Sequence, residues 1–205
     1  MYTNYPNIVF GFHVCESTLA EKLVSKKTNL RISNNPYDWL GAGMYFWENS
    51  PDRAKMYGEE LRKLNKLKKP TVVGAAISLG YCLDLLDSGS LKLLKASYDT
   101  LIETLKVAGE EVPANTPGNK KRGFGSDELL LRTLDCAVIN FLHAQRKQQE
   151  LRPFDCVRGV FWEGEPLYPT AGFKEKNHVQ IAVTNPNCIK GYFWPRTEDR
   201  KHLGT

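Results

Sequence analysis

Hydrophobic residues along this chain follow two different periods, and the changes of period predict the order of strands and helices. Short runs rich in β-branched and aromatic residues predict buried strands at 8–13, 44–47, 71–79, 157–162, 178–184 and 188–193. Segments in which hydrophobic residues recur every three or four positions predict helices after residue 17, from residue 51, over 90–108 and over 126–145. Strands therefore dominate both ends of the chain, and helices dominate its middle.

Polar residues mark where two of these helices begin. Thr18 and Glu21 have the spacing of a capping box, in which the two side chains bond free N–H groups of the first turn. Ser50 before Pro51 predicts an N-cap followed by proline at the first helical position. The basic residues of 62–69 complement the dipole at the end of that second helix, with phosphate contact as the alternative.

This arrangement predicts an α+β fold rather than alternating βαβ units. With 205 residues, the chain can form one domain with a sizeable core. We expect a single domain over 1–205 with a split, mixed β-sheet and a helical insertion over roughly 84–150. The segment 109–125 is rich in glycine, proline and asparagine, so it predicts a loop between the two long helices.

Composition narrows the environment and the partners. The formal net charge is +5, which favours a polyanionic partner but is also typical of an ordinary solvated surface. The 5 cysteines contain no CxxC pair, so they predict buried thiols in a reducing compartment instead of a metal or disulfide framework. The N-terminal residues lack a signal-like pattern, and no apolar run approaches the ~18 residues of a membrane span. We expect a cytoplasmic protein with no metal and no membrane contact.

Three separated motifs point to a particular chemistry. The first is Phe12-His13-Val14-Cys15, the second runs from Gly41 to Phe46 and is followed by Ala54 and Tyr57, and the third is the segment 178–183. In this order they resemble the H-Y-[E/D/Q] clade of ADP-ribosyltransferases, the poly-ADP-ribose-polymerase and diphtheria-toxin-like group. That family has a strand ending in His-Gly, a Gly-x-Gly-x-Tyr-Phe element before a helix bearing a tyrosine, and a closing strand bearing an acid or amide. The resemblance leaves 69–154 mostly unmatched.

The resemblance implies that NAD⁺ is the co-substrate and that the fold is ADP-ribosyltransferase-like. It implies catalytic roles for His13, Tyr45 and Gln180, with His13 bonding a ribose hydroxyl. Tyr45 and Tyr57 would stack on the cationic nicotinamide ring. Gly43 would let the backbone approach the ligand where a Cβ would clash.

Two positions depart from the family pattern. Val14 stands where the family usually has glycine; it retains the backbone N–H and C=O but adds bulk beside the carboxamide. Gln180 replaces the glutamate of chain-extending members, and an amide is not a general base at neutral pH. We therefore expect transfer of a single unit, or an acid supplied by one of three loop residues, Glu163, Glu165 and Glu175.

The function that follows is mono-ADP-ribosyl transfer to a macromolecule, with RNA or DNA slightly favoured over protein. Such an enzyme would be a toxin or phage-defence effector, and an antitoxin would be a possible partner. Lys120, Lys121 and Arg122 are the candidate acceptor contacts. Two alternatives stay open: an NAD⁺ glycohydrolase using the same pocket, and a non-catalytic nucleic-acid- or protein-binding module with a degenerate pocket. His13, Tyr45 and Tyr57 also fit purely structural roles in a strand or helix.

Overall fold

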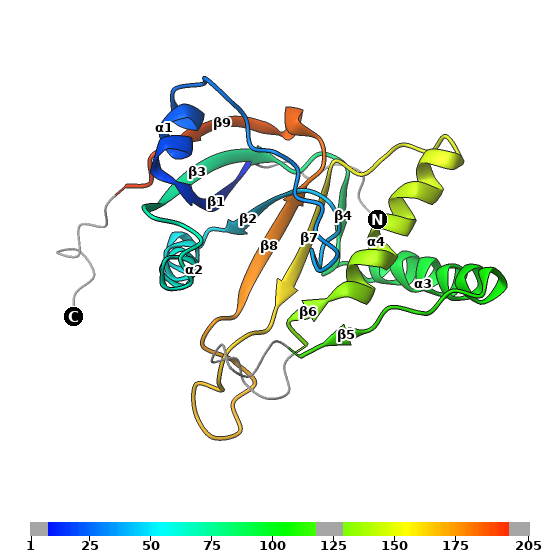
Figure 1. The fold of residues 1–205 in the computed structure, drawn as a ribbon. Helices are drawn as coiled ribbons and strands as arrows, with labels where there is room; N and C mark the ends of the chain where they lie inside the picture. The colour runs from blue at the N-terminus through cyan, green and yellow to red at the C-terminus, as the bar shows by residue number, and fades with distance from the viewer. Residues whose placement is uncertain (1–7, 118–128, 197–205) are drawn as a thin grey trace.

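The computed structural model describes residues 8–117 and 129–196 (Figure 1). Its helices are α1 (Ser17–Val24), α2 (Pro51–Lys63), α3 (Ser88–Ala108), α4 (Thr133–Gln148) and the short 3-10 helix η2 (Pro186–Cys188). Its strands are β1 (Ile8–Glu16), β2 (Met44–Glu48), β3 (Pro70–Ser78), β4 (Cys82–Asp84), β5 (Asn115–Thr116), β6 (Leu131–Arg132), β7 (Cys156–Phe161), β8 (His178–Val183) and β9 (Ile189–Phe193). Strands at both ends of the chain and long helices in its middle confirm the predicted α+β class.

Seven of the strands form one sheet in the order β4-β7-β8-β2-β1-β3-β9. The pair β4–β7 is parallel, whereas the other neighbours are antiparallel, so the sheet is mixed as predicted. The first and last thirds of the chain supply most of its strands. The motifs of the two chain ends consequently meet on neighbouring central strands, β1, β2 and β8.

The helices pack on both faces of the sheet. The side chains of each strand alternate between these faces, so neighbouring residues of one strand contact different helices. On β1, Cys15 packs with Leu23 of α1, while the preceding Val14 packs with Ala54 of α2 on the opposite face. Helix α4 shares the face of α2, since its Ile139 packs with Ala182 of β8. Strands β2 and β8 therefore cross the interval between α2 and α4 (Figure 1).

The segment between β4 and β7 contains the predicted helical insertion, but α4 begins later than expected. Residues 131–132 pair with 115–116 as the small β5–β6 hairpin, and α4 starts at Thr133. The side chain of Asn115 accepts hydrogen bonds from the N–H groups of Leu134 and Asp135. This long-range cap fixes the helix start, so the prediction of helix over 129–132 was wrong.

The capping box predicted for α1 is also wrong. The helix begins at Ser17, which puts Thr18 inside the first turn, and its N-cap position is Glu16. The Glu16 carboxylate accepts hydrogen bonds from the N–H groups of Lys68 and Lys69, at 3.0 and 2.9 Å. That carboxylate therefore joins α1 to the start of β3 instead of capping its own helix.

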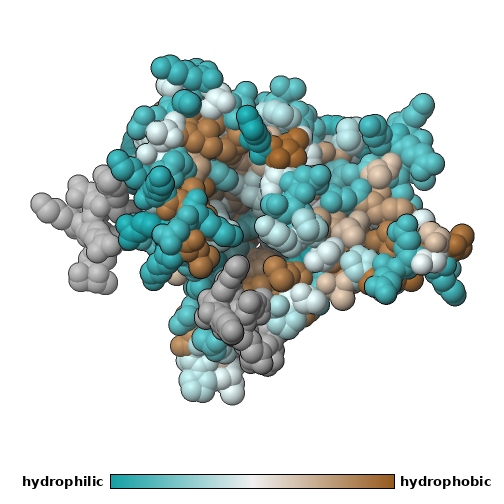
Figure 2. Space-filling model, viewed as in Figure 1, coloured by the Kyte–Doolittle hydropathy of each residue, from teal (hydrophilic) through white to brown (hydrophobic). Residues whose placement is uncertain are grey.

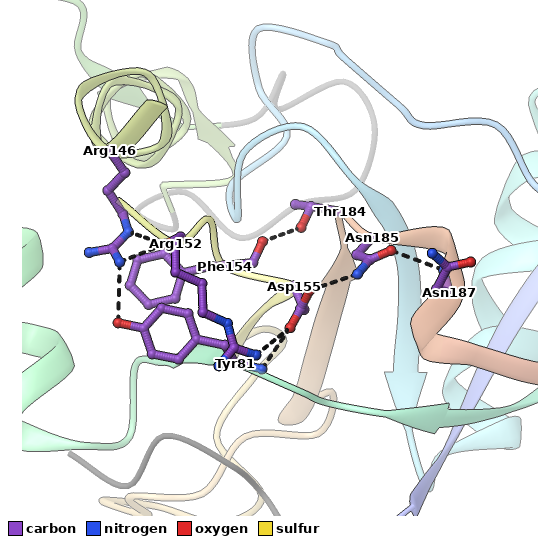
Figure 3. A network of polar contacts seen from close by, with 8 residues as sticks. All are labelled: Tyr81, Arg146, Arg152, Phe154, Asp155, Thr184, Asn185 and Asn187. Atoms are coloured by element: carbon purple, nitrogen blue, oxygen red, sulfur yellow. Dashed lines mark hydrogen bonds and ion pairs between the residues drawn. The ribbon is translucent and has the colours of Figure 1, made fainter. Parts of the chain in front are cut away.

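A polar network fixes the end of α4 to the edge of the sheet (Figure 3). Asp155 accepts hydrogen bonds from the N–H of Tyr81 at 2.8 Å and from the Asn185 amide at 2.7 Å. Arg146 of α4 donates to the Arg152 carbonyl at 2.6 Å, and its guanidinium lies 4.5 Å from the centre of the Phe154 ring. The insertion is thus held against β7 and β8 by specific contacts.

The five cysteines are free and buried, as the sequence predicts. In the part of the chain that the structure describes, no helix is both long and apolar enough to cross a membrane. Hydrophobic atoms reach the surface over the α3 and α4 side of the molecule (Figure 2), where Leu91 is half exposed.

Replacing Gly58 with alanine tests the packing of α2 on β1. The added Cβ would lie 2.7 Å from Val14 Cγ2 and 3.1 Å from Pro70 Cβ. We expect Gly58→Ala to lower the free energy of unfolding by about 1–3 kcal/mol in chemical denaturation, despite the better helix propensity of alanine. The control is Gly172→Ala, whose Cβ would meet nothing within 4 Å. Equal stability of the two variants would contradict this packing.

Candidate functional site: a split between two central strands

The central feature of the site is a split in the sheet between β1 and β2. These strands pair only at Gly11 with Glu48 and at Phe12 with Trp47. Beyond them, β1 continues along β3 to Glu16 while β2 continues along β8 to Met44. The ladder between β1 and β2 is therefore short, and it ends beside the first two motifs.

His13 bridges the split. Its Nδ1 lies 2.9 Å from the carbonyl oxygen of Tyr45 on the opposite strand. Because a carbonyl oxygen only accepts, Nδ1 must bear the proton. Burial lowers the pKa of His13, and the hydrogen bond to Tyr45 opposes that shift only in part. The ring is therefore neutral at pH 7, and its Nε2 is a hydrogen-bond acceptor.

Val14 directs its backbone and its side chain to different places. The N–H of Asn49 bonds the Phe10 carbonyl at 2.8 Å, so the backbone polar groups of Phe10 point toward the β2 side. Continuing the β1–β2 register would pair Val14, four residues further along β1, with Tyr45. Backbone polar groups of alternate residues point to the same neighbouring strand, so those of Val14 point toward the split. The side chain packs under α2, where Gly58 makes room for it. The bulk of valine therefore lies in the core, away from the split.

The side chain of Tyr45 holds the loop that precedes β2. Its hydroxyl donates to the Gly41 carbonyl at 2.8 Å and accepts from the Leu40 N–H at 3.0 Å. Gly41 has a φ of +76°, which glycine adopts without strain. The Tyr45 ring packs with the hydrophobic cluster between the sheet and α4. The order of glycine and tyrosine in this motif thus has a local structural cause.

Gly43 and Tyr57 occupy different parts of the same region. Gly43 pairs with Ser33, and a Cβ on it would lie 2.9 Å from that of Ala182. Its small size is therefore needed for packing on β8. Tyr57 of α2 is 38% exposed, and its ring lies 5.2 Å from that of Trp47. Of the two tyrosines predicted to stack on a ligand, Tyr57 presents the more accessible ring.

Gln180 lies on β8 opposite Trp47 of β2. Its Oε1 accepts a hydrogen bond of 2.7 Å from the indole Nε1 of Trp39. The indole N–H only donates, so the amide oxygen must face Trp39 and the NH₂ group must point elsewhere. The Gln180 amide is therefore oriented with its oxygen toward Trp39.

Aromatic rings continue from Tyr57 across this face of the sheet. Trp47 is 6.3 Å from His178, which stacks on Phe161 at 5.4 Å. Phe161 in turn meets Trp39 edge to face at 4.9 Å. In the view of Figure 2 the surface is hollowed between the α2 side and the α4 side. These rings and Gln180 line the sheet between those two helices.

A buried ion pair joins α2 to the β7–β8 connection beside these rings. Arg53 of α2 donates to Glu163 of the β7–β8 connection at 2.6 Å, and both side chains are less than 10% exposed. The Arg53 guanidinium lies 5.9 Å from the centre of the Trp47 ring. Burial, aided by the nearby Arg53 charge, lowers the pKa of His178 to about 4. His178 is accordingly neutral, with Nδ1 donating to the Lys176 carbonyl at 2.6 Å.

The three loop glutamates have different surroundings. Glu163 is committed to Arg53 and also lies 3.7 Å from Lys176 Nζ. Glu165 and Glu175 are exposed in the β7–β8 connection. Glu163 therefore links the β7–β8 connection to α2 through its ion pair.

The predicted acceptor contacts Lys120, Lys121 and Arg122 fall outside the described residues. Among the residues that are described, no group of three or more His, Cys, Asp or Glu side chains is arranged to hold a metal. Cavities of about 140 and 220 Å³ lie along α3 and α4, and neither is lined by a residue of the three motifs.

Sequence reasoning missed three residues that shape this face: Trp39, Arg53 and Arg132. Trp39 and Arg53 lie next to recognised motif residues, but their partners are 141 and 110 positions away. Arg132 packs its guanidinium 4.5 Å from the Phe161 ring. From the sequence, Arg132 near the start of a helix is explained by a local ion pair with Asp135, so its contact with Phe161 was not expected.

Comparison of the chain with family models, with curated proteins and with solved structures found no match.

The buried ion pair gives a direct test of how the β7–β8 connection is held. Removing one partner leaves a buried charge uncompensated, so Glu163→Ala should lower the free energy of unfolding by about 3–5 kcal/mol. The exposed Glu165→Ala and Glu175→Ala variants are matched controls and should change it by less than about 0.5 kcal/mol. Denaturant titration measures all three. Similar losses in all three variants would show that the pair does not hold the loop.

Proposed function

We propose that this chain is an NAD⁺-dependent mono-ADP-ribosyltransferase whose nicotinamide pocket is the split between β1 and β2. The observation that supports it best is the bridge from His13 Nδ1 to the Tyr45 carbonyl. This hydrogen bond uses the Tyr45 carbonyl oxygen, which Val14 would bond if the β1–β2 ladder continued. The backbone polar groups of Val14 point toward the split beside it. This arrangement joins the first two motifs of the family that the sequence resembles.

The split has the polarity that a nicotinamide group requires. A carboxamide has one acceptor and one NH₂ donor group, and the C=O and N–H of Val14 complement both. The neutral His13 ring would accept a hydrogen bond from a ribose hydroxyl through Nε2. Tyr57, at 38% exposure, would stack on the flat cationic ring.

The surroundings of Gln180 favour cleavage without a strong base. Departure of nicotinamide from ribose gives an oxocarbenium-like transition state, as in glycoside hydrolysis. Of the three loop glutamates, Glu163 is paired with Arg53, whereas Glu165 and Glu175 are exposed. The Gln180 amide can orient oxygen atoms of the ribose but does not take a proton. This chemistry suits attachment of one ADP-ribose unit and does not suit polymer growth.

For the acceptor we propose a macromolecule, with RNA or DNA favoured over protein because the chain is basic. Its net charge is +5, and several lysines lie at 63–69, from the last residue of α2 to the residue before β3. Contacts between these lysines and phosphates would make transfer fall steeply as salt concentration rises. The biological setting, a toxin or phage-defence effector with an antitoxin, belongs to the same proposal.

Incubation with labelled NAD⁺ tests the activity and separates transfer from hydrolysis. We expect label on RNA, DNA or protein, whereas a glycohydrolase would release only free ADP-ribose. His13→Ala should reduce NAD⁺ cleavage on the order of 100-fold, because it removes both the bridge and the Nε2 acceptor. Circular dichroism checks that the variant is folded. If wild-type protein neither binds nor cleaves NAD⁺, the proposal is wrong, and retained nucleic-acid binding would then favour the non-catalytic module.

The two tyrosines should respond differently to substitution. Tyr57→Ala should weaken NAD⁺ binding by about 1–3 kcal/mol through lost stacking, with little change in stability because the ring is half exposed. Tyr57→Phe retains the ring and is the matched control. Tyr45→Phe should instead lower the free energy of unfolding by about 1–3 kcal/mol, since the Leu40 N–H and Gly41 carbonyl lose their partner. Calorimetric titration and denaturation measure the two effects. Unchanged NAD⁺ binding in Tyr57→Ala, or unchanged stability in Tyr45→Phe, would contradict these assignments.

A further inference from the structure

We infer that Trp39 is a positioning residue that fixes the orientation of the Gln180 amide. This inference rests on the proposed function, because it concerns how Gln180 faces the same site. The evidence is the hydrogen bond of 2.7 Å from Trp39 Nε1 to Gln180 Oε1, which joins the loop before β2 to the middle of β8. The two residues are 141 positions apart, so only the fold brings them together.

An amide side chain has two ends of similar shape and opposite polarity. Rotation about its last bond exchanges the oxygen and the NH₂ group at little steric cost. The indole N–H of Trp39 can donate only to the oxygen, so it favours the orientation in which the oxygen faces the indole. Gln180 consequently presents its NH₂ donors in a fixed direction, and a ligand oxygen meets them without first reorienting the side chain.

Trp39 itself is held on several sides. Its ring lies over the β7 backbone, where a Cβ on Gly159 would be 3.2 Å from the ring edge. Phe161 meets the ring edge to face at 4.9 Å, and the Arg132 guanidinium lies 5.3 Å from its centre. The neighbouring Leu40 N–H bonds the Tyr45 hydroxyl at 3.0 Å. The donor is therefore preorganised by contacts that do not include Gln180.

This arrangement predicts that Trp39 acts only through Gln180. Substituting phenylalanine keeps an aromatic ring against β7 but removes the N–H. The Gln180 amide would then populate both orientations, and only one presents donors to the ribose. The cost falls on turnover, whereas NAD⁺ affinity, which we assign to Val14, His13 and Tyr57, should change little.

A double-mutant cycle with Trp39→Phe, Gln180→Ala and the combined variant tests this inference. We expect Trp39→Phe to lower kcat for NAD⁺ cleavage about two- to tenfold with KM nearly unchanged, because the amide then spends half of its time or more in the orientation without donors toward the ribose. In the Gln180→Ala background the same change should have no further effect on kcat. Trp194→Phe, at a half-exposed tryptophan near the end of β9, is the matched control and should match wild type.

The indole N–H resonances of the 4 tryptophans give a second readout that needs no NAD⁺. Gln180→Ala should shift the Trp39 resonance and speed its exchange with solvent, and leave the Trp194 resonance in place. The inference is overturned if Trp39→Phe lowers kcat by the same factor with and without Gln180, or if Gln180→Ala changes neither the shift nor the exchange rate of the Trp39 resonance. Absence of NAD⁺ cleavage by the wild-type protein would instead overturn the proposed function, and the kinetic role of Trp39 with it.

Discussion

The hydrogen bond between His13 Nδ1 and the Tyr45 carbonyl is the contact on which the arrangement of the site depends. Two strands that separate within a sheet leave backbone polar groups without their ladder partners, and leaving such groups buried costs free energy. A side chain that bonds one of these groups stabilises the split without closing it. In this chain the bridging ring is also neutral and keeps an acceptor at Nε2. One residue thus bonds a backbone group left by the separating strands and retains a second hydrogen-bonding atom.

Three further contacts join segments distant in the sequence to the same face of the sheet. The Tyr45 hydroxyl holds the loop before β2, the Trp39 indole holds Gln180, and Arg53 holds Glu163 of the β7–β8 connection. Each uses a strong donor or acceptor that is at least partly buried, where an unmade hydrogen bond costs most. The loops around β2 and β8 are therefore preorganised by side-chain contacts, although they have little regular structure.

The sequence predicted much of the fold because most of its elements follow local patterns. Strands such as Ile8–Glu16 and helices such as Pro51–Lys63 are marked by hydrophobic period and by Pro51 at a helix start. The errors at Thr18 and at the start of α4 have one cause: long-range hydrogen bonds accepted by the side chains of Glu16 and Asn115 determined the structure. The proximity of His13 and Tyr45 follows from the order of the motifs, but the orientation of the Gln180 amide depends on Trp39, which no local pattern marks.

The central claim, that the β1–β2 split is where NAD⁺ binds, is tested most directly by titrating NAD⁺ into isotope-labelled protein and following the backbone amide resonances. The account predicts the largest shifts at Val14, His13 and Tyr45, saturating with one common affinity, and no change at Leu93 and Leu142 of the α3–α4 cavity. Shifts confined to that cavity, or none at saturating NAD⁺, would contradict the account.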